Sequence, residues 1–246
     1  SALPTECGSF YTPEPGRVQE GVTQVVTFDV KKDADPHVVA VLGGAETVYA
    51  NEDVLVLGQT DWTYDLFSID STRTSLHQFA IDGSKTSYQA SGFVPGYLHN
   101  QFSIDEKDGV IRVSTTENVR TDANDPWVSE TRNRVFALSR GDSSEIEVLS
   151  RSEAFGETGE TIFATRFIGD RAYVVTFRQT DPLVVVDLSN PKKLEVLGEL
   201  HIPGFSDYIH PLANNRLLTI GQDADENGSQ TGVALQIFDV SDATNP

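Results

Sequence analysis

The residues best suited to chemistry form an acidic stretch near the C-terminal end of the chain. Asp223, Asp225 and Asn227 alternate with other residues and precede Gly228, which matches the start of a calcium loop. Such a loop needs oxygen ligands at alternate positions and a glycine that permits a tight bend around the cation. The twelfth position is Ala234, not the bidentate glutamate of an EF-hand. The pattern therefore predicts either a weak Ca²⁺ site in a β-hairpin or a solvated acidic turn.

Other metal-binding and nucleophilic patterns are weaker. Asp122, Asn124 and Asp125 form a poorer acidic cluster. The five histidines show no metal-ligand spacing, although His201 and His210 stand close enough in the chain to meet in the fold. The sequence contains no phosphate loop, dinucleotide fingerprint or Gly-x-Ser-x-Gly elbow. We therefore predict no catalytic residue from the sequence.

Three arginines gather in one short segment. Arg166, Arg171 and Arg178 stand near Asp170 and Asp181 in RFIGDRAYVVTFRQTD. In an acidic protein we expect such arginines to pair with carboxylates, above all Arg178 with Asp181 across one tight turn. The alternative is a site for an anionic ligand.

Aromatic residues stand on two long polar connections. Trp62 and Tyr64 lie in TDWTYDLFSIDSTRT, and Trp127 lies in ENVRTDANDPWVSETRN. Both connections fall between the same two strands of a repeated module, so we expect them to emerge on one face. Insertions collected on one face of a repeat protein often mark its binding face, so these three residues are the candidates for partner binding.

The elements that position these residues are predicted to be strands. Runs such as RAYVVTF, PLVVVDLS and LEVLGEL are rich in β-branched and large apolar residues and are too short for ordinary helices. A similar strand recurs about every 50 residues, a period typical of four-stranded propeller blades. Its equivalent positions are Phe28, Phe79, Phe136, Val186 and Phe238. We therefore predict an all-β fold, a partial β-propeller of four to five blades over residues 21–246, preceded by an extended lead-in at residues 1–20.

Long segments of the sequence are also recognisable. VPGYLHNQFSIDEKDGVIRVSTT, ETIFATRFIGDRAYVVTFRQTDPLVVVDLSNPKKLEVLGEL and TQVVTFDVKKDADPHVVAVLGG closely resemble secreted bacterial and archaeal proteins with a C-terminal β-propeller domain, distantly related to WD40 repeats. The resemblance covers the chain from about Cys7 to Pro246. It implies the propeller fold and a secreted, periplasmic or cell-surface location. It implies no catalytic residues, because that family has no established activity.

Composition restricts the partners. The chain has 18 basic and 37 acidic residues, a net charge of −19, so its surface repels nucleic acid and anionic membranes and attracts cations or basic partners. No apolar run is long enough to span a membrane. The single cysteine, Cys7, excludes an internal disulfide. The chain begins without Met and ends in a turn, so we expect a processed piece of a longer propeller.

These observations favour a non-enzymatic exported scaffold whose loops bind a macromolecular or glycan partner at the cell surface. One alternative is an enzyme with a site at the central channel, built from residues of several blades. Another is an open propeller unit that forms homo-oligomers through its exposed blade edges. Fold alone does not decide among them, because propellers carry many functions.

Overall fold

The protein is almost entirely β-structure. The computed structural model describes residues 7–12, 21–31, 35–62, 72–122, 125, 128–141, 144–177, 181–202, 205–224 and 230–246. Within these ranges the only helical elements are two 3-10 turns, η1 (Cys7–Ser9) and η2 (Gln101–Ser103). Among the described residues there is no helix with the length and apolar character needed to cross a membrane.

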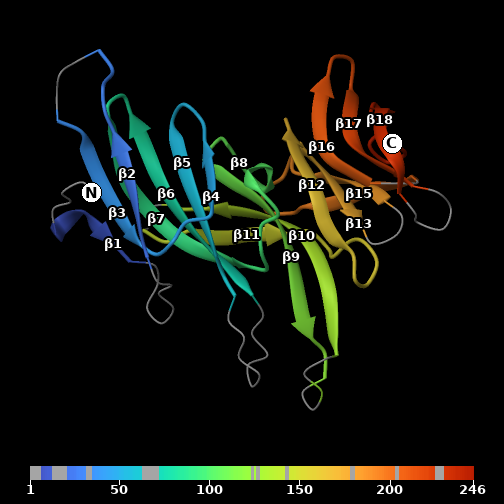
Figure 1. Ribbon diagram of the computed structural model, residues 1–246, viewed down its shortest axis with the longest axis horizontal. Coiled ribbons are helices and arrows are strands. Elements are labelled where there is room, and N and C mark those ends of the chain that lie inside the picture. Colours follow the sequence, from blue (N-terminus) through green and yellow to red (C-terminus); the bar gives the residue numbers. More distant parts are fainter. Residues whose placement is uncertain are drawn as a thin grey trace.

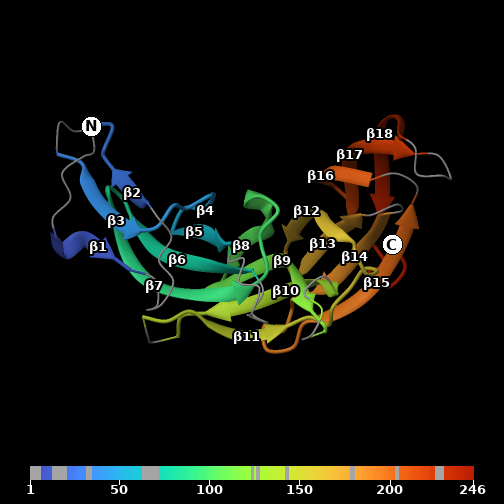
Figure 2. The ribbon, with the colours of Figure 1, turned by 60° about the horizontal axis from the view of Figure 1, so that its bottom comes forward.

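Five sheets follow one another along an arc (Figures 1 and 2), and we name them blades 1 to 5 in chain order. Blade 1 contains β1 (Phe10–Tyr11), β2 (Val22–Thr27) and β3 (His37–Leu42). Blade 2 contains β4 (Thr47–Ala50), β5 (Val54–Asp61), β6 (Arg73–Asp82) and β7 (Lys85–Pro95). Blade 3 contains β8 (Ile104–Lys107), β9 (Val110–Arg120), β10 (Ser129–Ser139) and β11 (Glu147–Arg151). Blade 4 contains β12 (Thr161–Ile168), β13 (Arg171–Phe177), β14 (Asp181–Asp187) and β15 (Glu195–Ile202). Blade 5 contains β16 (Phe205–Leu212), β17 (Arg216–Ala224) and β18 (Gln230–Asp239). The predicted all-β propeller of four to five blades is confirmed.

The predicted repeat is visible in the sheets. Phe79, Phe136, Val186 and Phe238 lie in β6, β10, β14 and β18, which are the third strands of blades 2 to 5. All four side chains are buried. In blades 2, 3 and 4 the pairing between third and fourth strands shifts register close to this position, so a β-bulge recurs with the sequence repeat.

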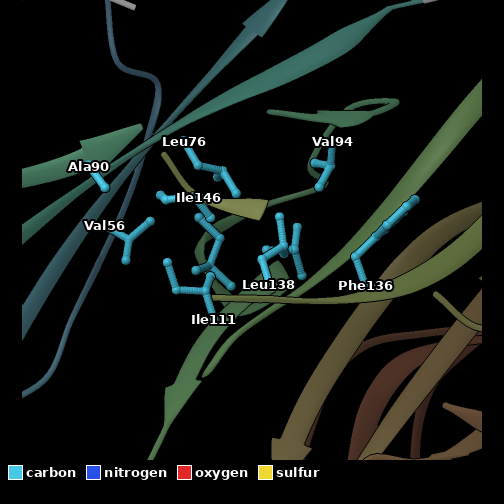
Figure 3. Close-up of a cluster of buried hydrophobic side chains, with 10 residues drawn as sticks. Val56, Leu76, Ala90, Val94, Ile111, Phe136, Leu138 and Ile146 are labelled. Atoms are coloured by element: carbon cyan, nitrogen blue, oxygen red, sulfur yellow. The ribbon is translucent and has the colours of Figure 1, made fainter. Parts of the chain in front are cut away.

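Packing between blades follows the same repeat. A residue at the repeat position packs against the preceding blade: Phe136 joins Ile111 and Leu76 between blades 2 and 3 (Figure 3). The residue just before it points the other way, so Val135 packs against blade 4. Val185, its equivalent in β14, packs against blade 5. Each blade therefore shows one apolar face to each neighbour, as alternation along a strand requires.

The two ends of the arc show apolar faces without a covering blade among the described residues. In β18, Val233, Leu235 and Ile237 are 73%, 68% and 64% exposed, although the repeat equivalents of the last two are buried in β14. At the other end, Phe28 is 62% exposed and is the exception among the repeat positions. In their sheets β2 and β18 are edge strands.

The long connections lie where the repeat predicts them. The pairs β5–β6, β9–β10 and β17–β18 are each the second and third strands of a blade. β5 and β9 both end toward the same, lower side of Figure 1. Within the predicted lead-in, Phe10 and Tyr11 form β1 and pair in parallel with β3. The boundary at residue 20 stays a prediction, because residues 13–20 lie outside the described ranges.

Candidate functional site

An exposed aromatic pair marks the side of blades 2 and 3 from which the connections leave. Trp62 follows the last residue of β5 and is 48% exposed. Its ring lies 5.1 Å from that of Tyr97, measured between centroids, at an angle of 35°. Burial raises the pKa of Tyr97, so its phenol stays neutral in the physiological range. The other predicted binding-loop residues, Tyr64 and Trp127, lie outside the described part of the chain.

The chain is held tightly where Tyr97 crosses from blade 2 to blade 3. Gly96 has a φ of +88°, and a Cβ there would lie 2.5 Å from the Thr116 carbonyl oxygen, so only glycine fits. The Tyr97 amide donates to the Thr116 carbonyl at 2.9 Å, and the Thr116 amide donates back to Tyr97 at 3.1 Å. The Thr74 hydroxyl donates to the Gly96 carbonyl at 2.8 Å. Tyr97 is therefore a fixed support for the Trp62 ring.

A groove of about 820 Å³ opens between blades 2 and 3, between the edge strands β7 and β11. A short segment of blade 3 runs along β7 and closes one end of it. The Ser91 amide donates to the Ser144 carbonyl at 3.1 Å, and the Ile146 amide donates to the Ser91 carbonyl at 2.7 Å. A Cβ on Gly92 would lie 2.2 Å from the Ile146 carbonyl oxygen, so this approach also depends on a glycine.

The groove combines apolar, aromatic and hydrogen-bonding groups. Phe93 is 43% exposed, and the Arg73 guanidinium lies 4.9 Å from the centre of its ring. The wall from β11 supplies the side chains of Glu147, Val148 and Arg151. None of the described lining residues is His, Cys or Lys, and the polar side chains are Thr12, the serines, Glu145, Glu147 and Arg151. The arrangement can bind a ligand by stacking and hydrogen bonding.

The groove and the aromatic pair are continuous along the chain. Phe93 and Pro95 line the groove, and Tyr97 follows two residues later. Arg73, which covers Phe93, is paired across the sheet with Asp61, the residue before Trp62. We use the name seam surface for Trp62, Tyr97 and the groove residues, which, apart from Thr12, come from blades 2 and 3 and the segments next to them.

A second group of aromatic and polar residues gathers where η2 meets the first strands of blades 4 and 5. The rings of His99 and Phe163 are 6.0 Å apart, and those of Phe102 and Tyr208 are 5.6 Å apart. The Tyr208 hydroxyl lies 3.3 Å from Nδ1 of His210. Residues of three blades therefore converge, as a central-channel site requires.

Two ionisable groups at this place have shifted pKa values. Burial lowers the pKa of His99, and the charge of Asp207 partly opposes this shift. Burial raises the pKa of Asp207, and the charge of His99 opposes it in turn. Neither residue could be predicted as part of a site from the sequence, because the two come from different blades and share no spacing. Whether His201 meets His210 is not tested, because the side chain of His201 lies outside the described ones.

Arg166 and Arg171, which were predicted to pair with carboxylates, have other partners in the structure. Asp170 accepts a hydrogen bond from Lys107 at 2.5 Å, and Arg171 donates to the Val240 carbonyl at 3.0 Å. Arg166 lies over the ring of Phe102, with its guanidinium carbon 5.1 Å from the ring centre. Arg178 is outside the described ranges, so its pairing with Asp181 stays a prediction.

The calcium loop is described only at its start. Asp223 is at the end of β17, where one of its carboxylate oxygens accepts a hydrogen bond from the Thr231 hydroxyl at 2.9 Å. Asp225 and Asn227 lie outside the described part. Among the residues that are described, no group of three or more His, Cys, Asp or Glu side chains is arranged to hold a metal ion. The Ca²⁺ site therefore stays a prediction.

Comparison with known families and sequences identifies a propeller family and two uncharacterized archaeal relatives. The sequence pattern of a family described as "Beta propeller domain" matches residues 2–246. An uncharacterized protein of Methanocaldococcus jannaschii is 41% identical over 158 residues, covering 63% of this chain and 23% of its own length. An uncharacterized protein of Archaeoglobus fulgidus is 44% identical over 153 residues, covering 62% of this chain and 21% of its own length. The chain thus spans about a fifth of the curated relatives it matches.

Solved structures with a similar fold include forms of an apocarotenoid oxygenase of Synechocystis. One variant superposes with a TM-score of 0.51 at 11% identity, over 93% of this chain and 55% of that one. The cobalt-substituted form superposes with a TM-score of 0.50 at 12% identity, over the same shares of both chains. At such low identity the likeness concerns the fold alone.

Proposed function

We propose that this chain, which belongs to the family of β-propeller domains, is a non-enzymatic exported scaffold. In this proposal it binds a macromolecular or glycan partner through the seam surface. The observation that supports this most is Trp62, which remains 48% exposed although its ring is backed by that of Tyr97. Well-supported exposed aromatic residues beside a groove are characteristic of binding hot spots.

The groove favours a glycan among the possible partners. Its serine hydroxyls can donate to or accept from sugar hydroxyls, and the carboxylates of Glu145 and Glu147 can accept from them. Phe93 and Val148 provide apolar contact for the faces of the rings. Its volume is in the range of small-molecule sites, so it can hold a few sugar units. A peptide strand added to the edge of β7 or β11 is the other outcome that the test below separates.

Replacing Trp62 by alanine should weaken partner binding by about tenfold or more, as the loss of a central aromatic contact does. Binding is measured by probing a glycan array with the labelled protein, followed by calorimetry with the oligosaccharide that binds best. Phe28→Ala is the matched control, because Phe28 is also exposed but lies at the far end of the arc.

Tryptophan emission provides a second readout of the same event. The chain has two tryptophans, Trp62 and Trp127, both on the predicted binding connections. The wild-type emission should shift when the oligosaccharide is added. If Trp62→Ala and wild type bind the same glycans equally, or if wild type binds none and peptides bind instead, the glycan proposal is wrong.

Export and calcium binding belong to the same proposal. A secreted, periplasmic or cell-surface location agrees with the net charge of −19, which gives a strongly hydrated exterior. Protease treatment of intact cells, followed by detection of the protein, measures whether it is exposed. Calorimetric titration of Ca²⁺ into wild type and Asp223→Ala, with a chelator as control, measures whether the acidic loop binds a cation.

Assembly through the ends of the arc is a second candidate function. The observation behind it is the exposed apolar face of β18, since Leu183 and Val185, the repeat equivalents of Leu235 and Ile237, are 1% and 0% exposed. In each blade interface of the arc, such a face is covered by the repeat-position face of the next blade. Blade 1 of a second copy carries that complementary face around Phe28. Contact of this head-to-tail kind forms rings or filaments.

Ile237→Asp should abolish this self-association, because it places a carboxylate at the centre of the apolar face. Light scattering after size-exclusion chromatography should show a mass that rises with concentration for wild type and a monomer for the variant. Val148→Asp makes the same change at an exposed position away from both ends and should associate as wild type does. A wild-type mass that stays monomeric at every concentration contradicts the proposal.

Catalysis at the axis is a third candidate, favoured by the meeting of His99 with Asp207 and by their opposite pKa shifts. A buried neutral imidazole beside a carboxyl can exchange a proton with a ligand. Hydrolysis of chromogenic esters and glycosides by wild type and His99→Ala is the measurement that tests it.

A further inference from the structure

A small pocket lies apart from the seam surface, on the inner side of the arc. Its volume is about 330 Å³, and three consecutive blades contribute to it: β4 of blade 2, η2 and β8 of blade 3, and β12 of blade 4. The walls combine apolar residues, Val48, Ala50, Phe102, Ile104 and Phe167, with the polar residues Tyr49, Gln101, Asp105 and Arg166. A space of this size fits a ligand built around one ring.

The charged group of this pocket is the guanidinium of Arg166. It lies over the ring of Phe102, which covers one of its faces and leaves the N–H groups at its edge free to point elsewhere. No carboxylate of the described residues lies within ion-pair distance of it. Other arginines in the same part of the chain have such partners: Arg132 pairs with Glu130, and Arg134 pairs with Glu117. Arg166 is therefore a half-buried guanidinium with no carboxylate partner among the described residues, in a chain with 37 acidic residues.

The carboxylate of the pocket is already occupied. Asp105 accepts a hydrogen bond from Nε of Arg112 at 2.7 Å, and the same arginine donates to the Gly169 carbonyl at 2.6 Å. Asp105 is therefore neutralised by a cation that is itself anchored to blade 4. Tyr49, on the wall from β4, has its pKa raised, mainly by burial, and stays uncharged. The pocket thus has one uncompensated charge, and that charge is positive.

We propose that this pocket binds a small carboxylate with an apolar or aromatic body. The carboxylate accepts paired hydrogen bonds from the edge of the Arg166 guanidinium, a geometry that an arginine provides and a lysine does not. The body of the ligand lies against Phe102, Phe167 and Val48 and is removed from water. This pocket shares no lining residue with the groove of the seam surface, and its ligand is an anion.

The test uses benzoate as the probe and benzamide as its uncharged match. Binding to the whole chain is measured by ligand-observed saturation-transfer NMR and by calorimetry. Wild type should bind benzoate at least about tenfold more tightly than benzamide, since hydrogen bonds to a charged group are the stronger ones. Arg166→Gln should lose this preference, and Arg166→Lys, which keeps the charge without the fork, should retain only part of it.

Two controls separate this site from the rest of the molecule. Arg132→Gln removes an arginine of blade 3 that is paired with Glu130, and it should bind benzoate as wild type does. Trp62→Ala should also bind benzoate normally, so failure of the seam surface proposal leaves this one intact. Thermal melting shows whether each variant is folded. Equal affinity for benzoate and benzamide, unchanged affinity in Arg166→Gln, or no binding of benzoate by wild type would each overturn the proposal.

Discussion

Phe79→Ala should lower the free energy of unfolding by about 3–5 kcal/mol, the usual cost of removing a fully buried phenylalanine. Phe79 is 0% exposed between blades 1 and 2, where its ring meets that of Tyr88 edge-on at 5.3 Å. The neighbouring strands are held in their sheets by backbone hydrogen bonds, so they cannot collapse into the space left by the ring. The loss therefore includes both the transfer of the ring and a cavity.

The repeat supplies the control for this variant. Phe28 occupies the equivalent position at the end of the arc but is 62% exposed, so Phe28→Ala should change the free energy of unfolding by less than about 0.5 kcal/mol. Urea unfolding followed by circular dichroism measures both. Equal effects of the two substitutions would show that the end of the arc is covered in solution, and a small effect of Phe79→Ala would contradict the interface described here.

Acid should destabilise the protein through His77. This residue is 1% exposed, and burial lowers the pKa of its imidazole from 6.5 to about 4. Because the folded state binds the proton less readily than the unfolded state, the stabilisation is complete above pH 6.5 and is lost as the pH falls toward 4. The free energy of unfolding should drop by about 3 kcal/mol across this interval from His77 alone.

His77→Gln isolates this contribution. The imidazole Nδ1 lies 3.1 Å from the Tyr88 hydroxyl, and Nε2 has no hydrogen-bond partner among the described residues. The glutamine amide can replace the hydrogen bond to Tyr88, and it stays uncharged at every pH. Other groups that titrate in this range, such as His99, are present in both proteins and cancel in the comparison. Urea unfolding at a series of pH values should give a steeper decline for wild type than for the variant. Parallel curves would mean that His77 does not titrate on unfolding.

The sequence contained much of the fold because the interior strands are apolar on both faces. RAYVVTF and PLVVVDLS form β13 and β14 in the middle of blade 4, and the position of Val186 recurs in every blade. The edge strands β7 and β11 were not predicted. Their sequences, KTSYQASGFVP and EVLSR, are mixed because these strands are partly solvated, so they carry little hydrophobic signal. The groove lies between these two strands, so it could not be predicted from the sequence.

The site residues differ in how visible they were. Trp62 could be predicted, since a tryptophan on a long polar connection stands out in the sequence. Arg166 could be identified in the sequence as a candidate for ion pairing or anion binding. The sequence could not show that Asp105, the carboxylate of the same pocket, is already paired with Arg112. His99 and Asp207 could not be paired at all, because the contact between η2 and blade 5 depends on the curvature of the whole arc.

The position of η2 affects how strongly the unfolding of one blade interface is coupled to the others. Sheets stacked in a row are coupled in series, so the effect of opening one interface fades with each further blade. Phe102 of η2 departs from this order, because it reaches Arg166 in blade 4 and Tyr208 in blade 5. Phe102 thereby connects blades 3, 4 and 5 directly, so these blades should unfold as one cooperative unit. Blade 1 is linked to that unit only through blade 2 among the described residues.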